Sequence, residues 1–102
     1  MNVDPGAKRV TRHLRIAGRV QGVGYRYALR TEAQHSGITG WVRNRRDGTV
    51  EAVVQGSPDA VAIILAWAKH GPPAARVTEV SAPAASGEFE RHYGGFELLP
   101  TV

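Results

Sequence analysis

One short segment of the chain combines two glycines and an arginine at a spacing suited to anion binding: Gln21, Gly22, Val23, Gly24, Tyr25 and Arg26. Glycines at alternate positions allow positive φ, so successive backbone N–H groups can converge on one point. The apolar spacing after this segment predicts a helix, whose first N–H groups are unpaired and carry the positive end of its dipole. Residues 21–26 are therefore a candidate phosphate-binding loop.

The arginine in this segment favours a functional interpretation over an ordinary strand-to-helix turn, which glycines alone would also fit. Arg26 lies in the first turn of the predicted helix, where a cation opposes the helix dipole by about 0.3–1 kcal/mol. A bound anion removes that cost, and a guanidinium can contact two phosphate oxygens at once. The P-loop and dinucleotide motifs do not fit, since Gly24 is followed by Tyr25 and Arg26, and Tyr27 stands where a third glycine would be.

A second candidate, Asn44, ends the predicted strand Ile38–Asn44. Its neutral amide can donate and accept hydrogen bonds, so it could hold a water molecule at a fixed distance from a bound phosphoryl group. Asparagine is also common where strands enter turns, and this structural role stays open from spacing alone. Trp41 is expected to pack for buried area. The neighbouring arginines are expected to form a solvated rim and are Arg43, Arg45 and Arg46.

Metal and thiol chemistry find no support in the sequence. The chain has no cysteine, which excludes disulfides, thiol nucleophiles and cysteine-ligated metal centres. The histidines lack the spacing typical of metal ligands and are expected at the surface: His13, His35, His70 and His92. We therefore expect no metal and no other cofactor.

The elements that must position these residues follow from periodicity and turn signals. The predicted strands cover 12–20, 38–44, 49–55, 76–82 and 96–99, and the predicted helices cover 25–36 and a segment capped by Ser57. Asp47-Gly48 indicates a hairpin turn, and the three-residue spacing of Val77 and Val80 indicates a β-bulge. The order β-α-β-β-α-β predicts an α+β, ferredoxin-like fold in which two helices cover one face of an antiparallel sheet.

Length and charge limit the possible organisation of the chain. Its 102 residues suit one domain, which we expect over 12–102 after a flexible tail of 1–11. Residues 1–46 hold ten basic and two acidic residues, a formal charge of +8, whereas the rest holds three basic and seven acidic residues. The longest apolar run is far short of the ~20 residues of a membrane span, and the first residues lack a secretory signal. A soluble cytoplasmic domain with an anionic ligand is expected.

Five blocks of the sequence stand in a specific order and spacing: Gly18–Arg26, Gly40–Asn44, Asp47–Ala52, Gly71–Val77 and Gly95–Glu97. Together they closely resemble the acylphosphatases, and the resemblance runs from about Leu14 to Leu98. One departure is Tyr25, where that family more often has phenylalanine. The added hydroxyl is expected to leave the loop intact.

The resemblance implies a ferredoxin-like enzyme that hydrolyses acyl phosphates to carboxylate and inorganic phosphate, the latter also acting as an inhibitor. The family's phosphate-binding loop falls on residues 21–26, its catalytic arginine on Arg26 and its water-orienting asparagine on Asn44. Neither a metal nor a covalent phosphoenzyme is implied. We expect a monomer that acts on a small molecule, without a membrane or a specific nucleic acid as partner.

Two non-catalytic alternatives share the predicted fold, because fold alone does not determine function. The first is an RNA-recognition module, which needs aromatic residues on its central strands to stack bases. The corresponding strand here, Thr49–Val54, has no aromatic residue. The second is a regulatory module that binds phosphate without turning over an acyl phosphate.

Overall fold

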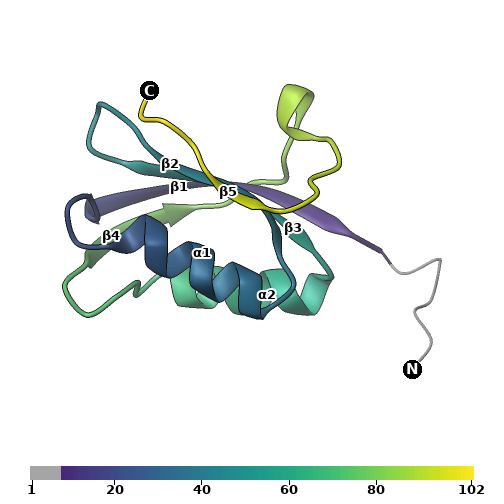
Figure 1. The fold of residues 1–102 in the computed structure, drawn as a ribbon, viewed down its shortest axis with the longest axis horizontal. Helices are drawn as coiled ribbons and strands as arrows, with labels where there is room; N and C mark the ends of the chain where they lie inside the picture. The colour runs from purple at the N-terminus through teal and green to yellow at the C-terminus, as the bar shows by residue number, and fades with distance from the viewer. Residues whose placement is uncertain (1–7) are drawn as a thin grey trace.

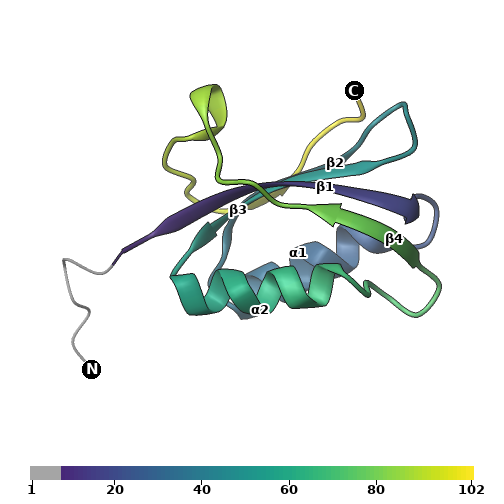
Figure 2. The same cartoon turned by 180° about the vertical axis from the view of Figure 1, so that it is seen from behind.

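Residues 8–102, the part described in this computed structural model, form a five-stranded sheet with two helices on one face (Figures 1 and 2). The strands are β1 (Val10–Arg19), β2 (Thr39–Asn44), β3 (Val50–Gly56), β4 (Arg76–Ser81) and β5 (Phe96–Leu98). The helices are α1 (Tyr25–His35), α2 (Pro58–Ala68) and the short 3₁₀ helix η1 (Gly87–Phe89). The predicted α+β, ferredoxin-like fold is confirmed.

The sheet is mixed, which corrects the prediction of a purely antiparallel one. Its strand order is β4-β1-β3-β2-β5, and β5 pairs in parallel with β2 while the other neighbours are antiparallel. The reason is the path of the chain after β4. The strand ends opposite Arg15, the chain continues along β1 to a bridge between Ala84 and Arg12, and residues 82–95 cross to the opposite edge of the sheet (Figure 2). The chain therefore enters β5 at the beginning of β2 and must run in the same direction.

The beginning of the first strand differs from the prediction. Val10 pairs with Gly56 and Thr11 with Gln55, so the sheet begins two residues before the expected boundary at Arg12. The first seven residues of the expected flexible tail lie outside the described residues. At the other end of the strand, Ala17 pairs with Glu79 and Gly18 with Val77, which leaves Thr78 unpaired. This extra residue confirms the predicted bulge in β4.

The predicted caps and turns explain where the helices and the hairpin begin and end. The side chain of Ser57 accepts a hydrogen bond from the N–H of Ala60, and Pro58 occupies the first position of α2. The turn between β2 and β3 is closed by hydrogen bonds from Arg45 N–H to Thr49 O, at 2.9 Å, and from Gly48 N–H to Arg45 O, at 3.1 Å. Local sequence signals therefore determine both connections.

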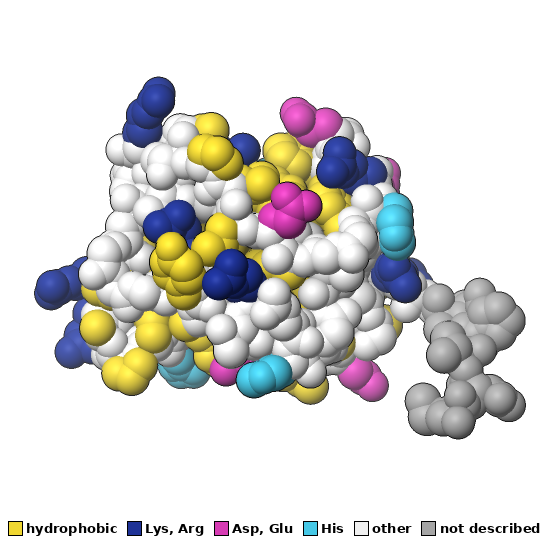
Figure 3. Space-filling model, in the orientation of Figure 1, with side chains coloured by type: hydrophobic (Ala, Val, Ile, Leu, Met, Phe, Trp, Pro, Cys, Tyr) yellow, Lys and Arg dark blue, Asp and Glu magenta, His cyan; other side chains and the backbone are white. Residues whose placement is uncertain are grey.

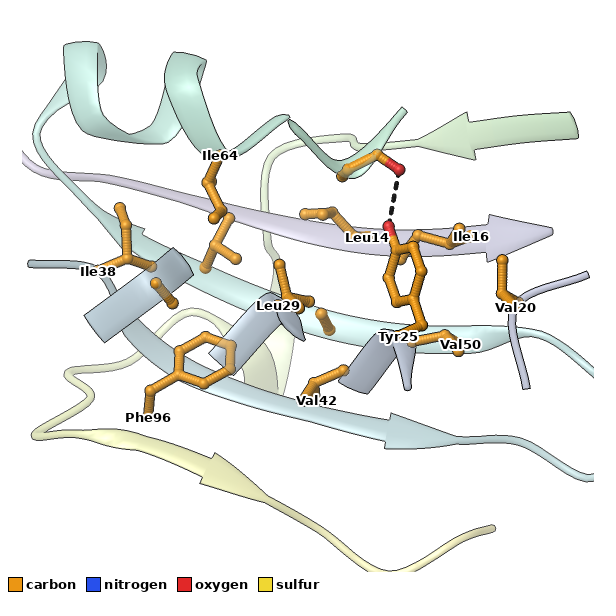
Figure 4. Close-up of a cluster of buried hydrophobic side chains, with 14 of the residues drawn as sticks. Leu14, Ile16, Val20, Tyr25, Leu29, Ile38, Val42, Val50, Ile64 and Phe96 are labelled. Carbon is orange, nitrogen blue, oxygen red and sulfur yellow. Dashed lines mark hydrogen bonds between the residues drawn. The ribbon is translucent and has the colours of Figure 1, made fainter. Parts of the chain in front are cut away.

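The main core lies between the sheet and the helices (Figure 4). Its fully buried side chains include Leu14 and Ile16 from β1, Leu29 from α1, Val42 from β2 and Ile64 from α2. A second cluster on the opposite face of the sheet joins Trp41 and Val53 to Tyr93, with Phe89 and Leu99 packed against it. The crossing segment 82–95 therefore covers part of the sheet face that carries no helix.

Candidate active site

The loop from β1 to α1 combines two left-handed glycines with a helix start that no side chain caps. Gly22 and Gly24 have φ values of 74° and 80°, in the left-handed region that favours glycine. Gly24 is the N-cap of α1, and no side chain caps the helix there. The N–H groups of the first turn are therefore available to a ligand, as the sequence predicts for an anion-binding loop.

A pocket of about 150 Å³ opens at this loop. Its lining consists of Val20, Gly22, Gly24, Tyr25, Arg26, Tyr27 and Asn44. The structure thus brings the end of β2 to the start of α1, and it unites the two candidate residues that the sequence placed 18 positions apart. A larger hollow of about 280 Å³, on the sheet face without helices, contains none of the predicted site residues.

Asn44 contributes a buried acceptor to this pocket. Its backbone pairs with Val50 and its carbonyl accepts a hydrogen bond from Val102 N–H at 3.2 Å, so the residue is held through its main chain. Among the described residues, its side-chain Oδ1 is buried and has no hydrogen-bond partner. Buried polar atoms are nearly always paired, and an unpaired one costs about 1–3 kcal/mol. Asn44 therefore lines the pocket with an acceptor that the described residues leave unsatisfied.

Arg26 is the cation of the pocket. It lies in the first turn of α1, which contains no acidic residue, and it forms no ion pair within residues 8–102. Its guanidinium carbon lies 5.7 Å from the ring centroid of Tyr27. The N-terminal end of the α1 dipole and the guanidinium of Arg26 are both positive, so the site attracts an anion.

Gln21 has a structural role that the sequence did not reveal. Its side-chain Nε2 donates hydrogen bonds to Arg45 O at 2.7 Å and to Thr49 O at 2.8 Å. These bonds join the start of the loop to the hairpin that follows Asn44. Gln21 and Val23 do not line the pocket, and Val23 packs against the main core. These two hydrogen bonds, called the Gln21 clamp below, keep the loop and the end of β2 at a fixed separation.

The hydroxyl of Tyr25 is directed away from the site. The side chain is 1% exposed, and its hydroxyl donates a hydrogen bond to Ala68 O at 2.7 Å, the dashed line in Figure 4. Burial raises the pKa of this phenol above its ordinary value. The hydroxyl of Tyr25 therefore forms a bond between the start of α1 and the end of α2.

A buried carboxylate organises the hairpin, which corrects two sequence expectations. Glu51 is 2% exposed and accepts hydrogen bonds from His13 at 2.6 Å, Arg43 at 2.8 Å and Arg45 at 2.9 Å. His13, Arg43 and Arg45 are thus not solvated surface residues, although Arg46 is exposed. Burial raises the pKa of Glu51, but the three hydrogen bonds and the adjacent positive charge outweigh this and lower the pKa to about 2.

The described residues contain neither a membrane-spanning helix nor a cluster of metal-binding side chains. No helix in the part of the chain from residue 8 onward is long and apolar enough to cross a membrane. Within the same part, no group of three or more His, Cys, Asp or Glu side chains is arranged to hold a metal ion.

Comparisons with known proteins show the family of this chain. The acylphosphatase family model matches residues 12–98, so the chain belongs to the acylphosphatase family. It is similar to the acylphosphatase of Thiobacillus denitrificans, at 56% identity over 85% of this chain and 93% of that protein. It is also similar to the acylphosphatase of Thermococcus kodakarensis, at 59% identity over 72% and 80% of the two chains. A solved acylphosphatase structure from Coxiella burnetii is similar with a TM-score of 0.82 and 34% identity, over 89% of this chain and 93% of that one.

Proposed function

We propose that this chain hydrolyses acyl phosphates to a carboxylate and inorganic phosphate in the pocket between the β1–α1 loop and the end of β2. Membership of the acylphosphatase family supports the activity. The observation that carries the mechanism is that one small pocket is lined by an arginine with no ion pair within residues 8–102 and by an asparagine whose amide oxygen is buried and unpaired in the same part of the chain.

In this proposal the loop holds the phosphoryl group. The backbone N–H groups of residues 21–26 and the guanidinium of Arg26 bind its oxygens. Their positive charge stabilises the negative charge of the transition state. Gln21 contributes through its backbone, because its side-chain amide is already bonded to the hairpin. Little rearrangement is then needed when the substrate binds, which is the condition for strong electrostatic stabilisation.

Asn44 then positions the attacking water. Its Oδ1 accepts a hydrogen bond from the water and so orients an oxygen lone pair toward phosphorus. A bond forms between the water oxygen and phosphorus while the bond from phosphorus to the acyl oxygen breaks. The electron pair of that bond leaves with the carboxylate.

The proton of the water goes to the phosphoryl group in this scheme. The side chains that line the pocket include no histidine, aspartate or glutamate that could act as a base. An acyl phosphate already has a good leaving group, so positioning and charge stabilisation suffice for turnover. Neither a metal nor a covalent phosphoenzyme takes part.

The activity is tested with benzoyl phosphate in the presence of excess chelator. Wild type should turn over the substrate, and Arg26→Ala should lower kcat/KM by about 10³-fold or more and abolish inhibition by phosphate. Activity that vanishes with chelator would contradict the metal-free mechanism. Protection by phosphate against unfolding, without any hydrolysis, would identify the chain as a binding module instead.

We also infer a monomeric, cytoplasmic enzyme with no specific nucleic-acid partner. Against RNA recognition stands the crossing segment 82–95, which packs Phe89 and Tyr93 over Trp41 on the sheet face that such modules use for bases (Figure 1). Trp41 is only 8% exposed and so is not available for stacking. Gel filtration tests the monomeric state, and a salt titration against random RNA tests the absence of a specific nucleic-acid partner.

A further inference from the structure

The outer wall of the pocket is an exposed aromatic ring. Tyr27 lines the pocket and is 55% exposed. Tyr25, Leu29 and Ala33 form the buried face of α1, and at about 100° per residue Tyr27 lies on the opposite face. Tyr27 therefore lines the pocket from the exposed face of α1, on the side away from the core.

Two guanidinium groups flank this ring. The guanidinium carbon of Arg26 lies 5.7 Å and that of Arg30 lies 5.4 Å from the ring centroid of Tyr27. The two arginines are four positions apart, so their backbones are separated by about 6 Å along the helix axis. Figure 3 shows yellow side chains between two dark blue ones on the face formed by α1.

Arg30 has no carboxylate partner within residues 8–102. Like charges at this spacing on a helix destabilise it by a few tenths of a kcal/mol, and Arg26 already opposes the helix dipole. The cation pair therefore lowers the stability of the helix unless anions bind to it. The catalytic proposal gives Arg26 an anion and leaves Arg30 without one.

We propose that Arg30 is a specificity-determining residue that selects acyl phosphates whose acyl group ends in a second carboxylate. This inference rests on the proposed function, because Arg26 must hold the phosphoryl group. In-line attack by a water on Asn44 sends the acyl group away from Asn44, and the exposed Tyr27 lines the same pocket beside Arg26. A carboxylate about one helical turn from phosphorus then reaches the guanidinium of Arg30.

Tyr27 supports this arrangement in two ways. Its exposed ring offers apolar surface to the methylene groups between the two ends of such a substrate. Its face also attracts the guanidinium of Arg30, which restricts the rotamers of a long side chain before the substrate binds. The substrate class is thus the monoacyl phosphate of a short dicarboxylic acid.

The test compares succinyl phosphate with butanoyl phosphate, which has the same chain length and no second carboxylate. The measured quantity is the ratio of their kcat/KM values at low ionic strength. In Arg30→Gln this ratio should fall about three- to tenfold, through KM, as expected for the loss of one exposed charged contact. Arg30→Lys should restore most of the ratio, because it retains the charge.

A matched control is Arg91→Gln, which removes an exposed arginine that also lies over a tyrosine ring, at 5.0 Å from Tyr93, but outside the pocket. It should leave the ratio unchanged. The inference is overturned if Arg91→Gln lowers the ratio equally, or if Arg30→Gln lowers both substrates alike. It is also overturned if wild type does not prefer succinyl phosphate. If wild type hydrolyses neither substrate, the proposed function itself is overturned.

Discussion

Replacing Asn44 by alanine should lower the turnover of acyl phosphates without lowering the stability of the fold. The side-chain oxygen is buried without a partner in the described part of the chain, and both of the residue's recorded hydrogen-bonding interactions, with Val50 and Val102, are made by its backbone. Removing the amide therefore breaks no side-chain hydrogen bond of the described residues and removes an unsatisfied acceptor that costs about 1–3 kcal/mol. The free energy of unfolding of Asn44→Ala should be equal to that of wild type or higher.

The same substitution removes the group that positions the attacking water. Loss of one well-placed electrostatic group typically lowers kcat by about 10²–10³, which corresponds to about 2.7–4 kcal/mol in the transition state. Inhibition by phosphate should persist, because Arg26 and the loop are intact. Asn44→Ala should thus lower kcat while keeping or raising the free energy of unfolding, as expected where a site retains an unsatisfied group for function.

The assay combines benzoyl phosphate kinetics, the inhibition constant of phosphate and urea unfolding. Gln34→Ala is a suitable control, since it removes an exposed amide from α1 outside the pocket. Near-normal turnover in Asn44→Ala would refute the water-positioning role. A large loss of stability together with weakened phosphate inhibition would show instead that Asn44 acts as a structural residue.

Two further predictions concern buried groups outside the pocket. Tyr25→Phe removes the hydrogen bond to Ala68 O and should lower the free energy of unfolding by about 1 kcal/mol while leaving turnover unchanged; a loss of turnover would show that this bond supports the loop. The folded-state pKa of Glu51, about 2, lies below its ordinary value of 4.5, so its contribution to stability is complete above pH 4.5 and is lost as the pH falls toward 2. Glu51→Gln should lower the free energy of unfolding at neutral pH by about 3 kcal/mol and flatten its decline over that acid range, as followed by tryptophan fluorescence. An equally steep decline in the variant would contradict the assignment.

Local signals in the sequence were sufficient for most elements of the fold. Ser57 as a cap, Asp47-Gly48 as a turn and the spacing of Val77 and Val80 as a bulge each depend on neighbouring residues, and each is confirmed. The direction of β5 could not be predicted in this way. It depends on the route of residues 82–95 across the sheet, which only the packed structure determines.

The same distinction applies to the site. Glycine spacing and Arg26 indicated the loop, and the structure brings Asn44 to it. The Gln21 clamp was not predicted, because its acceptors Arg45 O and Thr49 O lie 24 and 28 positions along the chain. The bonds to Glu51 were not predicted either, because strand pairing brings its partners to it. A glutamate in an alternating strand carries no signal that distinguishes a buried network from solvated charge.

The Gln21 clamp also couples the motion of two parts of the molecule. Its two acceptors, Arg45 O and Thr49 O, lie on either side of the hairpin turn, so the loop cannot leave its place while the hairpin keeps both bonds. Local opening of a folded protein occurs in cooperative units. Fraying of the hairpin and release of the phosphate loop are therefore one event, and amide exchange at both should share one opening rate.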